Sequence, residues 1–197
     1  MTEHVKKSRP MRPAPAWASR LGILELSVSP AVKGLSIRDQ LAERLHRYCW
    51  AFDERNPELL KECFTKDAIW EGHVMGETEV GPHRGSDAIM TYLTTFWKYQ
   101  RDQRRHVITN VLVESLDAEH ATCIAYLLLL GSKHASTQFE TAGFYKVNYR
   151  REGSTWRISR LTAGFDSPYW NQEVEEMEPS VKELFGITRH EAATADE

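Results

Sequence analysis

The sequence predicts an α+β fold in which a curved, mainly antiparallel sheet forms a cone-shaped half-barrel and about three N-terminal helices pack on it. Two observations support this prediction. Apolar residues recur at helical spacing in three stretches before residue 98, and from residue 105 onward they follow the alternating period of strands in four successive segments. Helices followed by a run of strands favour an arrangement in which the helices cover one side of the sheet.

Three helices are expected in the first half of the chain. The capping box from Ser36 to Asp39 begins a helix of roughly 17 residues that ends at Asp53. Asn56 followed by Pro57 is typical of a helix N-terminus and predicts a short second helix. A strand over residues 67–74 and a loop over residues 75–84, which contain two glycines and a proline, precede a third helix that begins near residue 86.

The second half of the chain is predicted to form four consecutive strands, at about residues 105–116, 120–132, 137–151 and 154–166. We expect one domain over residues 35–168. Residues 1–34, rich in proline and basic residues, are expected to form a flexible arm. Residues 169–197 are expected to form a tail with a short helix near residues 180–185.

The composition limits the classes of function. The chain of 197 residues is 41% hydrophobic with six tryptophans, which is enough for one substantial core. Its net charge of −3 gives no basic surface for nucleic acid, and no apolar run has the length of a membrane span. The three cysteines lie in apolar contexts, which favours buried free thiols. We therefore expect a cytoplasmic protein without nucleic-acid or membrane partners.

The stretch 105–114 is the centre of the functional argument. In an uninterrupted strand one face carries β-branched residues and is expected to be core: Val107, Thr109, Val111 and Val113. The other face carries an imidazole and a carboxamide among aliphatic residues: His106, Ile108, Asn110 and Leu112. Polar groups on such a face are costly without partners or a ligand, so we expect this face to line a pocket.

Four segments carry a resemblance to a known family: residues 48–53, 67–70, 105–110 and 145–158. In order and spacing, over roughly residues 36–168, they resemble the SnoaL-like branch of the nuclear transport factor 2 superfamily, whose fold is cystatin-like. Within that branch the chain is most similar to the group of scytalone dehydratase, the bile-acid 7α-dehydratase and the hexachlorocyclohexane dehydrochlorinase.

This resemblance implies an elimination reaction without a cofactor, on a small hydrophobic, aromatic or steroid-like substrate. The implied catalytic residues are His106 and Asp53, with Tyr48 five positions before the aspartate. A neutral imidazole suits proton abstraction near neutral pH, and a carboxylate on its other nitrogen fixes the tautomer. A tyrosine hydroxyl can donate to a carbonyl or to the leaving oxygen. Further expected substrate contacts are Asn110, Trp50, Trp70, Tyr145 and Phe144.

Each of these residues also has a purely structural interpretation. His106 and Tyr145 can be packing residues, Tyr48 can fill the core, and Asp53 can simply end its helix. Glu71, His73 and His83 lie close in sequence, but nothing else has ligand spacing, so we expect no metal site.

Departures from the family pattern leave the function open. The catalytic aspartate of the steroid isomerases falls at Gly72, and a further aspartate of the bile-acid enzyme falls in the apolar run 127–130. One alternative is a structural subunit like the β subunits of ring-hydroxylating dioxygenases, and another is a binding protein that holds a small ligand. By resemblance we also expect a homo-oligomer, a dimer or a trimer.

Overall fold

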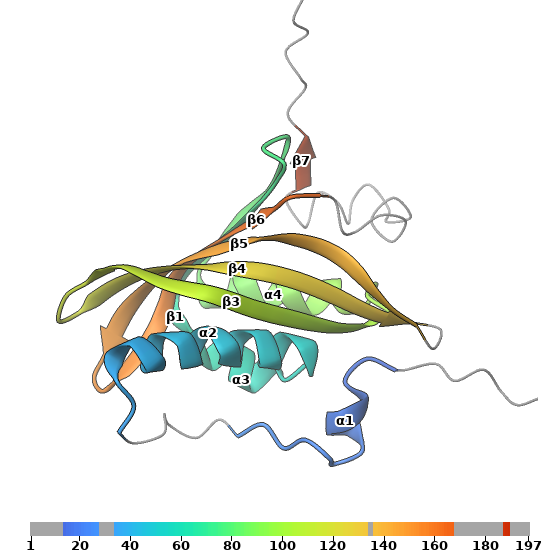
Figure 1. The fold of residues 1–197 in the computed structure, drawn as a ribbon, viewed down its shortest axis with the longest axis horizontal. Helices are drawn as coiled ribbons and strands as arrows, with labels where there is room; N and C mark the ends of the chain where they lie inside the picture. Colours follow the sequence, from blue (N-terminus) through green and yellow to red (C-terminus); the bar gives the residue numbers. More distant parts are fainter. Residues whose placement is uncertain (1–13, 28–33, 134–135, 168–186, 190–197) are drawn as a thin grey trace, which may run out of the picture.

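The computed structural model describes residues 14–27, 34–133, 136–167 and 187–189, and Figure 1 shows how its elements are arranged. The tail helix expected near residues 180–185 lies outside the described residues. Within these ranges, none of the helices combines the length and the apolar character needed to cross a membrane.

Four helices lie in the described part of the chain: α1 (Trp17–Arg20), α2 (Ile37–Asp53), α3 (Pro57–Glu62) and α4 (Ser86–Phe96). Helices α2, α3 and α4 confirm the three helices predicted from the sequence. The hydroxyl of Ser36 accepts a hydrogen bond from the N–H of Asp39 and so begins α2. The side chain of Asn56 accepts from the N–H of Leu59 at 2.9 Å and begins α3. Gly85, whose φ is 88°, precedes α4.

Residues 14–27 pack against the domain, so the prediction of a flexible arm does not describe this segment. Ala16 and Ala18 are buried, and the N–H of Ala16 donates to Oε1 of Gln103 at 2.6 Å. Ser19 donates to the carboxylate of Glu54. The local sequence gave no sign of this docking because the partners lie 87 and 35 positions further along the chain.

The described residues form one seven-stranded sheet in the order β3-β4-β5-β6-β1-β2-β7. The strands are β1 (Phe64–Val74), β2 (Thr78–Arg84), β3 (Gln103–Leu116), β4 (His120–Lys133), β5 (Ser136–Glu152), β6 (Thr155–Phe165) and β7 (Ile187–Arg189). All neighbours pair antiparallel except β1 and β6, which run parallel. The four predicted consecutive strands are confirmed as β3 to β6.

Strand β2 occupies residues that were predicted to be a loop, and this prediction was wrong. Glycine and proline are typical of loops, but Gly81 and Pro82 of β2 both lie opposite the single residue Glu71 of β1. The pairing of β1 and β2 therefore contains a bulge, and a bulge accepts a proline that cannot donate to the ladder. Only the turn at residues 75–77 remains of the predicted loop.

Strand β3 contains a bulge of its own, which corrects the predicted faces. Asn110 has a φ of 53°, and the register with β4 shifts between Thr109 and Leu112. The extra residue reverses the alternation of side chains beyond it. Val107 and Thr109 are therefore exposed rather than in the core. Ile108 before the bulge and the predicted core residues Val111 and Val113 after it all pack against the core.

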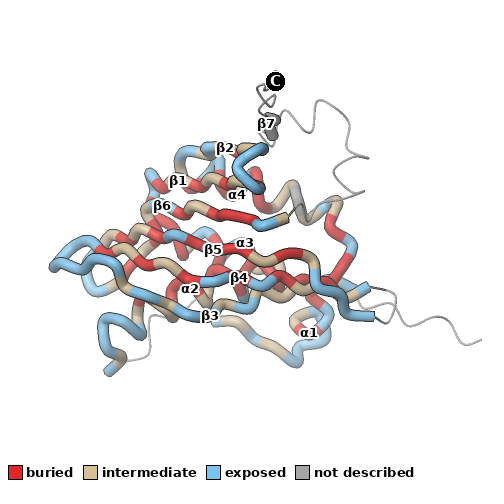
Figure 2. The backbone as a smooth tube through the Cα atoms, turned by 45° about the horizontal axis from the view of Figure 1, so that its top comes forward, coloured by how far each residue is buried: buried red, intermediate tan, exposed pale blue. Residues whose placement is uncertain are grey.

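The core lies between the concave face of the sheet and the helices. Figure 1 shows α2, α3 and α4 on one side of the curved sheet, and Figure 2 shows buried and less buried residues alternating along the strands. Fully buried side chains come from α2, α3, α4 and the central strands: Leu41, Leu45, Leu60, Ile89, Leu127, Val147 and Leu161. The three free cysteines are buried, as predicted. Burial raises the pKa of the Cys63 thiol to about 11.

Candidate active site

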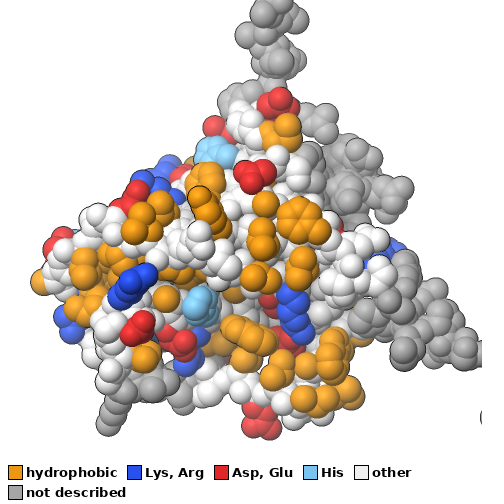
Figure 3. Space-filling model, in the orientation of Figure 1, with side chains coloured by type: hydrophobic (Ala, Val, Ile, Leu, Met, Phe, Trp, Pro, Cys, Tyr) orange, Lys and Arg blue, Asp and Glu red, His pale blue; other side chains and the backbone are white. Residues whose placement is uncertain are grey.

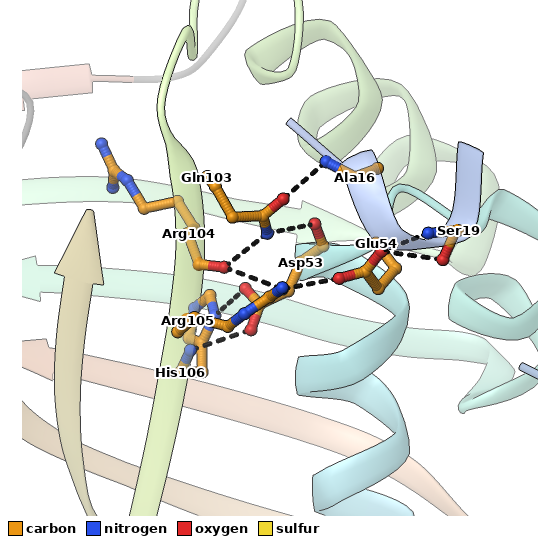
Figure 4. Close-up of polar contacts among 8 residues, drawn as sticks. All are labelled: Ala16, Ser19, Asp53, Glu54, Gln103, Arg104, Arg105 and His106. Carbon is orange, nitrogen blue, oxygen red and sulfur yellow. Dashed lines mark hydrogen bonds and ion pairs between the residues drawn. The ribbon is translucent and has the colours of Figure 1, made fainter. Parts of the chain in front are cut away.

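Asp53 and His106 form a hydrogen-bonded pair where the end of α2 meets β3 (Figure 4). Asp53 Oδ1 lies 2.6 Å from His106 Nδ1, and Asp53 Oδ2 accepts a hydrogen bond from the His106 backbone N–H at 2.9 Å. The side chain of Asp53 is 5% exposed and that of His106 is 8% exposed. Both carboxylate oxygens therefore bind the same residue of β3.

This geometry defines the roles of the two ring nitrogens. An ionised carboxylate only accepts hydrogen bonds, so Nδ1 of His106 carries the proton that Asp53 binds. The other ring nitrogen, Nε2, is then the one that can accept or release a proton. The ring is held between two aromatic side chains: Phe52 meets it edge-on at 5.4 Å, and Tyr145 stacks on it at 6.3 Å between ring centroids.

His106 lines a cavity of about 30 Å³ inside the cone. The other lining residues are mostly aromatic: Tyr48, Phe52, Trp70, Tyr92, Leu93, Arg104, Leu129, Tyr145 and Phe165. This volume has room for about one group the size of a water molecule. Ligand pockets for drug-sized molecules measure roughly 300–1,000 Å³, so the aromatic side chains fill most of the cone.

Tyr48 and Trp70, both expected at the site, are joined by a hydrogen bond in this cavity. Nε1 of Trp70 donates to the phenolic oxygen of Tyr48 at 3.2 Å. Tyr48 also meets the ring of Tyr145 edge-on at 6.0 Å. The structure therefore brings His106, Asp53, Tyr48, Trp70 and Tyr145 together at one end of the cone interior.

Three expected substrate contacts lie elsewhere, which corrects their predicted positions. Asn110 is exposed at the β3 bulge. Phe144 is 44% exposed, because neighbouring residues of a strand point to opposite faces and Tyr145 points inward. Trp50, also 44% exposed, lines a separate surface groove and lies 5.9 Å from the guanidinium of Arg105.

Several lining residues were not predicted from the sequence. Arg104 lies two positions before His106 on the same strand, so strand alternation could have identified it. Its side chain is 4% exposed, and its Nε donates to Asp102 at 2.5 Å. Phe52 adjoins Asp53 and could also have been inferred. Leu129 and Phe165 come from other strands, and no local pattern marks them.

The residues considered as metal ligands do not converge. Glu71 accepts two hydrogen bonds from Arg160, at 3.0 and 2.8 Å, and one from Thr162. Burial raises the pKa of the Glu71 carboxyl, but these hydrogen bonds outweigh it and the net pKa is lowered. His83 instead stacks on Tyr92 at 4.2 Å. In the part of the chain that the structure describes, no three His, Cys, Asp or Glu side chains are grouped to hold a metal ion.

Comparisons with known proteins place the fold. The family model of the SnoaL-like domain matches residues 34–162. No curated protein sequence matches the chain. Among solved structures, a protein of unknown function from Mycobacterium tuberculosis is 21% identical with a TM-score of 0.56, over 75% of this chain and 83% of that one.

Two further structures are similar to the same degree. LinA is 21% identical with a TM-score of 0.56, over 66% of this chain and 85% of LinA. A protein assigned as the β subunit of an aromatic-ring-hydroxylating dioxygenase from Novosphingobium aromaticivorans is 15% identical with a TM-score of 0.56, over 66% of this chain and 90% of that one. At these identities the similarity establishes the fold alone.

Proposed function

Since the chain belongs to the SnoaL-like family, we propose that it is a lyase that eliminates water or another small leaving group from a small, largely apolar substrate. The observation that carries this proposal is the buried Asp53–His106 pair, whose imidazole lines an aromatic cavity. The resemblance of the sequence to the dehydratases and the dehydrochlorinase of this family implies the same type of reaction.

The proposed reaction uses groups of the chain itself. Nε2 of His106 takes the proton from a carbon next to an electron-withdrawing group, and the electrons of that C–H bond form the new double bond. The bond to the leaving group on the neighbouring carbon breaks, and the leaving group departs with its electron pair. A departing hydroxide takes the proton back from the His106 imidazolium and leaves as water, which returns the imidazole to its neutral form. Asp53 stabilises the imidazolium that forms. Tyr48 and Tyr145 line the same cavity and are our candidates to bind the developing negative charge.

The volume of the cavity limits the substrate. At about 30 Å³ it does not hold a steroid nucleus, which the family resemblance suggested as one option. A small apolar ring fills a cavity of about 150 Å³. We therefore propose a substrate no larger than a substituted ring, whose binding displaces some of the aromatic side chains that line the cavity.

The test is a panel of small hydroxylated and halogenated compounds, with product formation followed by mass spectrometry. His106→Ala and Asp53→Asn are expected to lower turnover about 10²–10⁴-fold while the protein stays folded. His120→Ala is the matched control, because His120 lies 3.7 Å from Asp117 in an exposed His–Asp pair outside the cavity. Full activity in both His106→Ala and Asp53→Asn would falsify the proposal.

A structural subunit is the second candidate. The nearly filled cone supports it, because a subunit that only holds an assembly together needs no open pocket. The similarity to the dioxygenase β subunit fits this candidate as well. Expression in the native host with a tag on the chain distinguishes the two: a larger oxygenase subunit that purifies with the chain favours the structural role. A ligand that is retained without conversion instead favours a binding protein.

We also propose that the chain forms a homo-oligomer, a dimer or a trimer, through the outer face of the sheet. Five large apolar side chains on this face, which we call the outer patch, are exposed by 37–60%: Val107, Tyr126, Leu128, Phe139 and Phe144. The register places Val107 beside Leu128 and Tyr126 beside Phe144, and Figure 3 shows apolar side chains exposed over β4 and β5. Exposed contiguous apolar surface of this kind is typical of protein interfaces.

Light scattering after size exclusion tests this assembly. Leu128→Asp puts a charge in the centre of the outer patch and is expected to shift the protein to the monomer. Leu21→Asp is the control, since Leu21 is 70% exposed but lies in the N-terminal segment. An unchanged mass for Leu128→Asp would remove the outer patch from consideration.

The cysteines support a cytoplasmic location. All three are free and buried, and disulfide formation is rare in that compartment. We propose that the protein acts there, and cell fractionation tests it.

A further inference from the structure

Two buried side chains, those of Gln103 and Glu54, join the N-terminal segment to the Asp53–His106 pair (Figure 4). Gln103 lies three positions before His106, and Glu54 follows Asp53 directly. Both polar groups bind residues of the segment Ala16–Ser19 as well as residues that flank the pair. The reaction proposed above does not use either of them.

Gln103 uses its whole amide to connect three segments. Its Oε1 accepts from the N–H of Ala16 at 2.6 Å, and its Nε2 donates to the carbonyl oxygens of Asp53 at 3.1 Å and Arg104 at 2.8 Å. The carbonyl of Asp53 belongs to the last turn of α2, which has no partner within the helix. Gln103 thus holds the N-terminal segment, the end of α2 and the start of β3 at fixed positions.

Glu54 makes a second connection between the same segments. Its side chain is 0% exposed. Oε1 accepts from Arg105 at 2.6 Å, and Oε2 accepts from the hydroxyl of Ser19 at 2.7 Å and from its N–H at 3.3 Å. Arg105 directly precedes His106. The N-terminal segment therefore supplies both protein donors to Oε2, and Arg105 supplies the donor to Oε1.

The Asp53–His106 pair is sensitive to this arrangement because it depends on the position of β3 relative to α2. One of its two hydrogen bonds uses the backbone N–H of His106, so a shift of the strand breaks both together. The backbone conformation of Ala16 also indicates that the docking is specific. Its φ of 54° lies in the left-handed region, which a residue other than glycine keeps only where its surroundings enforce it.

We infer that the segment Ala16–Ser19 is a strap that fixes the Asp53–His106 pair, with Gln103 and Glu54 as the positioning residues through which it acts. The geometry of the pair carries this inference, and only its consequence for turnover rests on the proposed lyase function. The strap makes the N-terminal segment a part of the site although none of its residues lines the cavity.

The test compares Ala16→Pro with Ala16→Gly in the full-length protein. Proline removes the N–H that binds Gln103 and cannot adopt the φ of Ala16, whereas glycine keeps both. The readout is the proton on His106 Nδ1, observed by NMR as a downfield signal protected from exchange by its hydrogen bond to Asp53. We expect this signal in the wild type and in Ala16→Gly, and its loss in Ala16→Pro.

Ser19→Ala is the second variant, and it tests the inference even if Ala16→Pro does not fold. It removes only the 2.7 Å hydrogen bond to Glu54 and is expected to speed exchange of the His106 signal. Asn148→Ala, which removes a hydrogen bond to Thr122 in another part of the sheet, is the matched control and leaves the signal unchanged. With a substrate in hand, Ala16→Pro lowers kcat about 10–100-fold with little change in KM.

The NMR experiment needs no substrate, so its outcome is independent of the proposed reaction. If the His106 signal is the same in the wild type, Ala16→Pro and Ser19→Ala, the segment is only a stabilising attachment and the inference is wrong. If the signal is lost in Ala16→Pro while no substrate is ever converted, the strap stands and the lyase proposal fails.

Discussion

The two faces of the sheet differ in how their polar and apolar side chains are distributed. On the concave face aromatic side chains fill the cone, and the polar pair Asp53–His106 is buried and fully joined. The outer face carries exposed large apolar side chains and also ion pairs such as Glu71–Arg160. Successive residues of one strand belong to opposite faces: Leu129 is 2% exposed and Leu128 is 38% exposed.

The two faces differ in which groups are costly: buried charges on the concave face and exposed apolar groups on the outer face. A buried charged group is costly unless every lone pair has a partner, so the concave face tolerates a carboxylate only in a fixed pair. The outer face has no such limit on charges, but exposed apolar groups gain nothing there in a monomer. The cavity that His106 lines on the concave face therefore favours a ligand, and the outer patch favours a partner.

The largest contrast is expected from one charge placed on either face of β4. Leu129→Asp puts an unpaired carboxylate in the aromatic cavity and is expected to lower the free energy of unfolding by about 3–5 kcal/mol. Leu128→Asp, one residue away, is expected to change it by less than about 0.5 kcal/mol in the monomer. Urea denaturation followed by circular dichroism measures both, at a protein concentration at which light scattering shows the wild type as a monomer. Equal losses in the two variants would contradict the assignment of faces.

A smaller contrast is expected from the removal of one hydroxyl on each face. Tyr48→Phe leaves buried Nε1 of Trp70 without its acceptor, which costs about 1–3 kcal/mol. Tyr126→Phe removes a hydroxyl from a side chain that is 60% exposed and is expected to be neutral within about 0.5 kcal/mol. Thermal unfolding of the two variants at one pH gives the comparison, and a neutral Tyr48→Phe would argue that another group accepts from Trp70.

The sequence predicted those parts of the fold that depend on local rules. The caps at Ser36 and Asn56 set the start of α2 and α3, and hydrophobic periodicity identified β3 to β6. The errors arose where two strands pair with unequal numbers of residues. The bulges at Gly81–Pro82 and at Asn110 depend on the partner strand, so the sequence of one strand does not determine which side chains point inward beyond them.

The sequence likewise predicts only part of the candidate site. Asp53, His106, Tyr48, Trp70 and Tyr145 come together as expected. Phe144 could have been excluded from the sequence, since it adjoins Tyr145 and the two cannot share a face. In the structure its ring lies over Gly164, where a Cβ would come within 2.2 Å of it. The docking of Ala16 and Ser19 rests on contacts distant in sequence and on no motif, so only the structure reveals it.

The smallest effect is expected for the Glu71–Arg160 pair on the outer face, and it depends on pH. The pKa of Glu71 is lowered in the folded protein, because hydrogen bonds from Arg160 and Thr162 outweigh its partial burial. A lowered pKa gives stability that is present above the pKa of the unfolded chain, about 4.3, and is lost as the pH falls through the folded value. Glu71→Gln is therefore expected to cost about 1 kcal/mol or less at pH 7, since Arg160 is 46% exposed and water screens the pair.

A double-mutant cycle with Arg160→Gln separates the pair from its surroundings. The coupling energy between the two positions is expected to be measurable at pH 7 and smaller at pH 3, which lies below the pKa of a glutamate in the unfolded chain. Urea denaturation of the four proteins at the two pH values provides it. A coupling energy that is the same at both pH values would mean that packing rather than charge couples the two side chains.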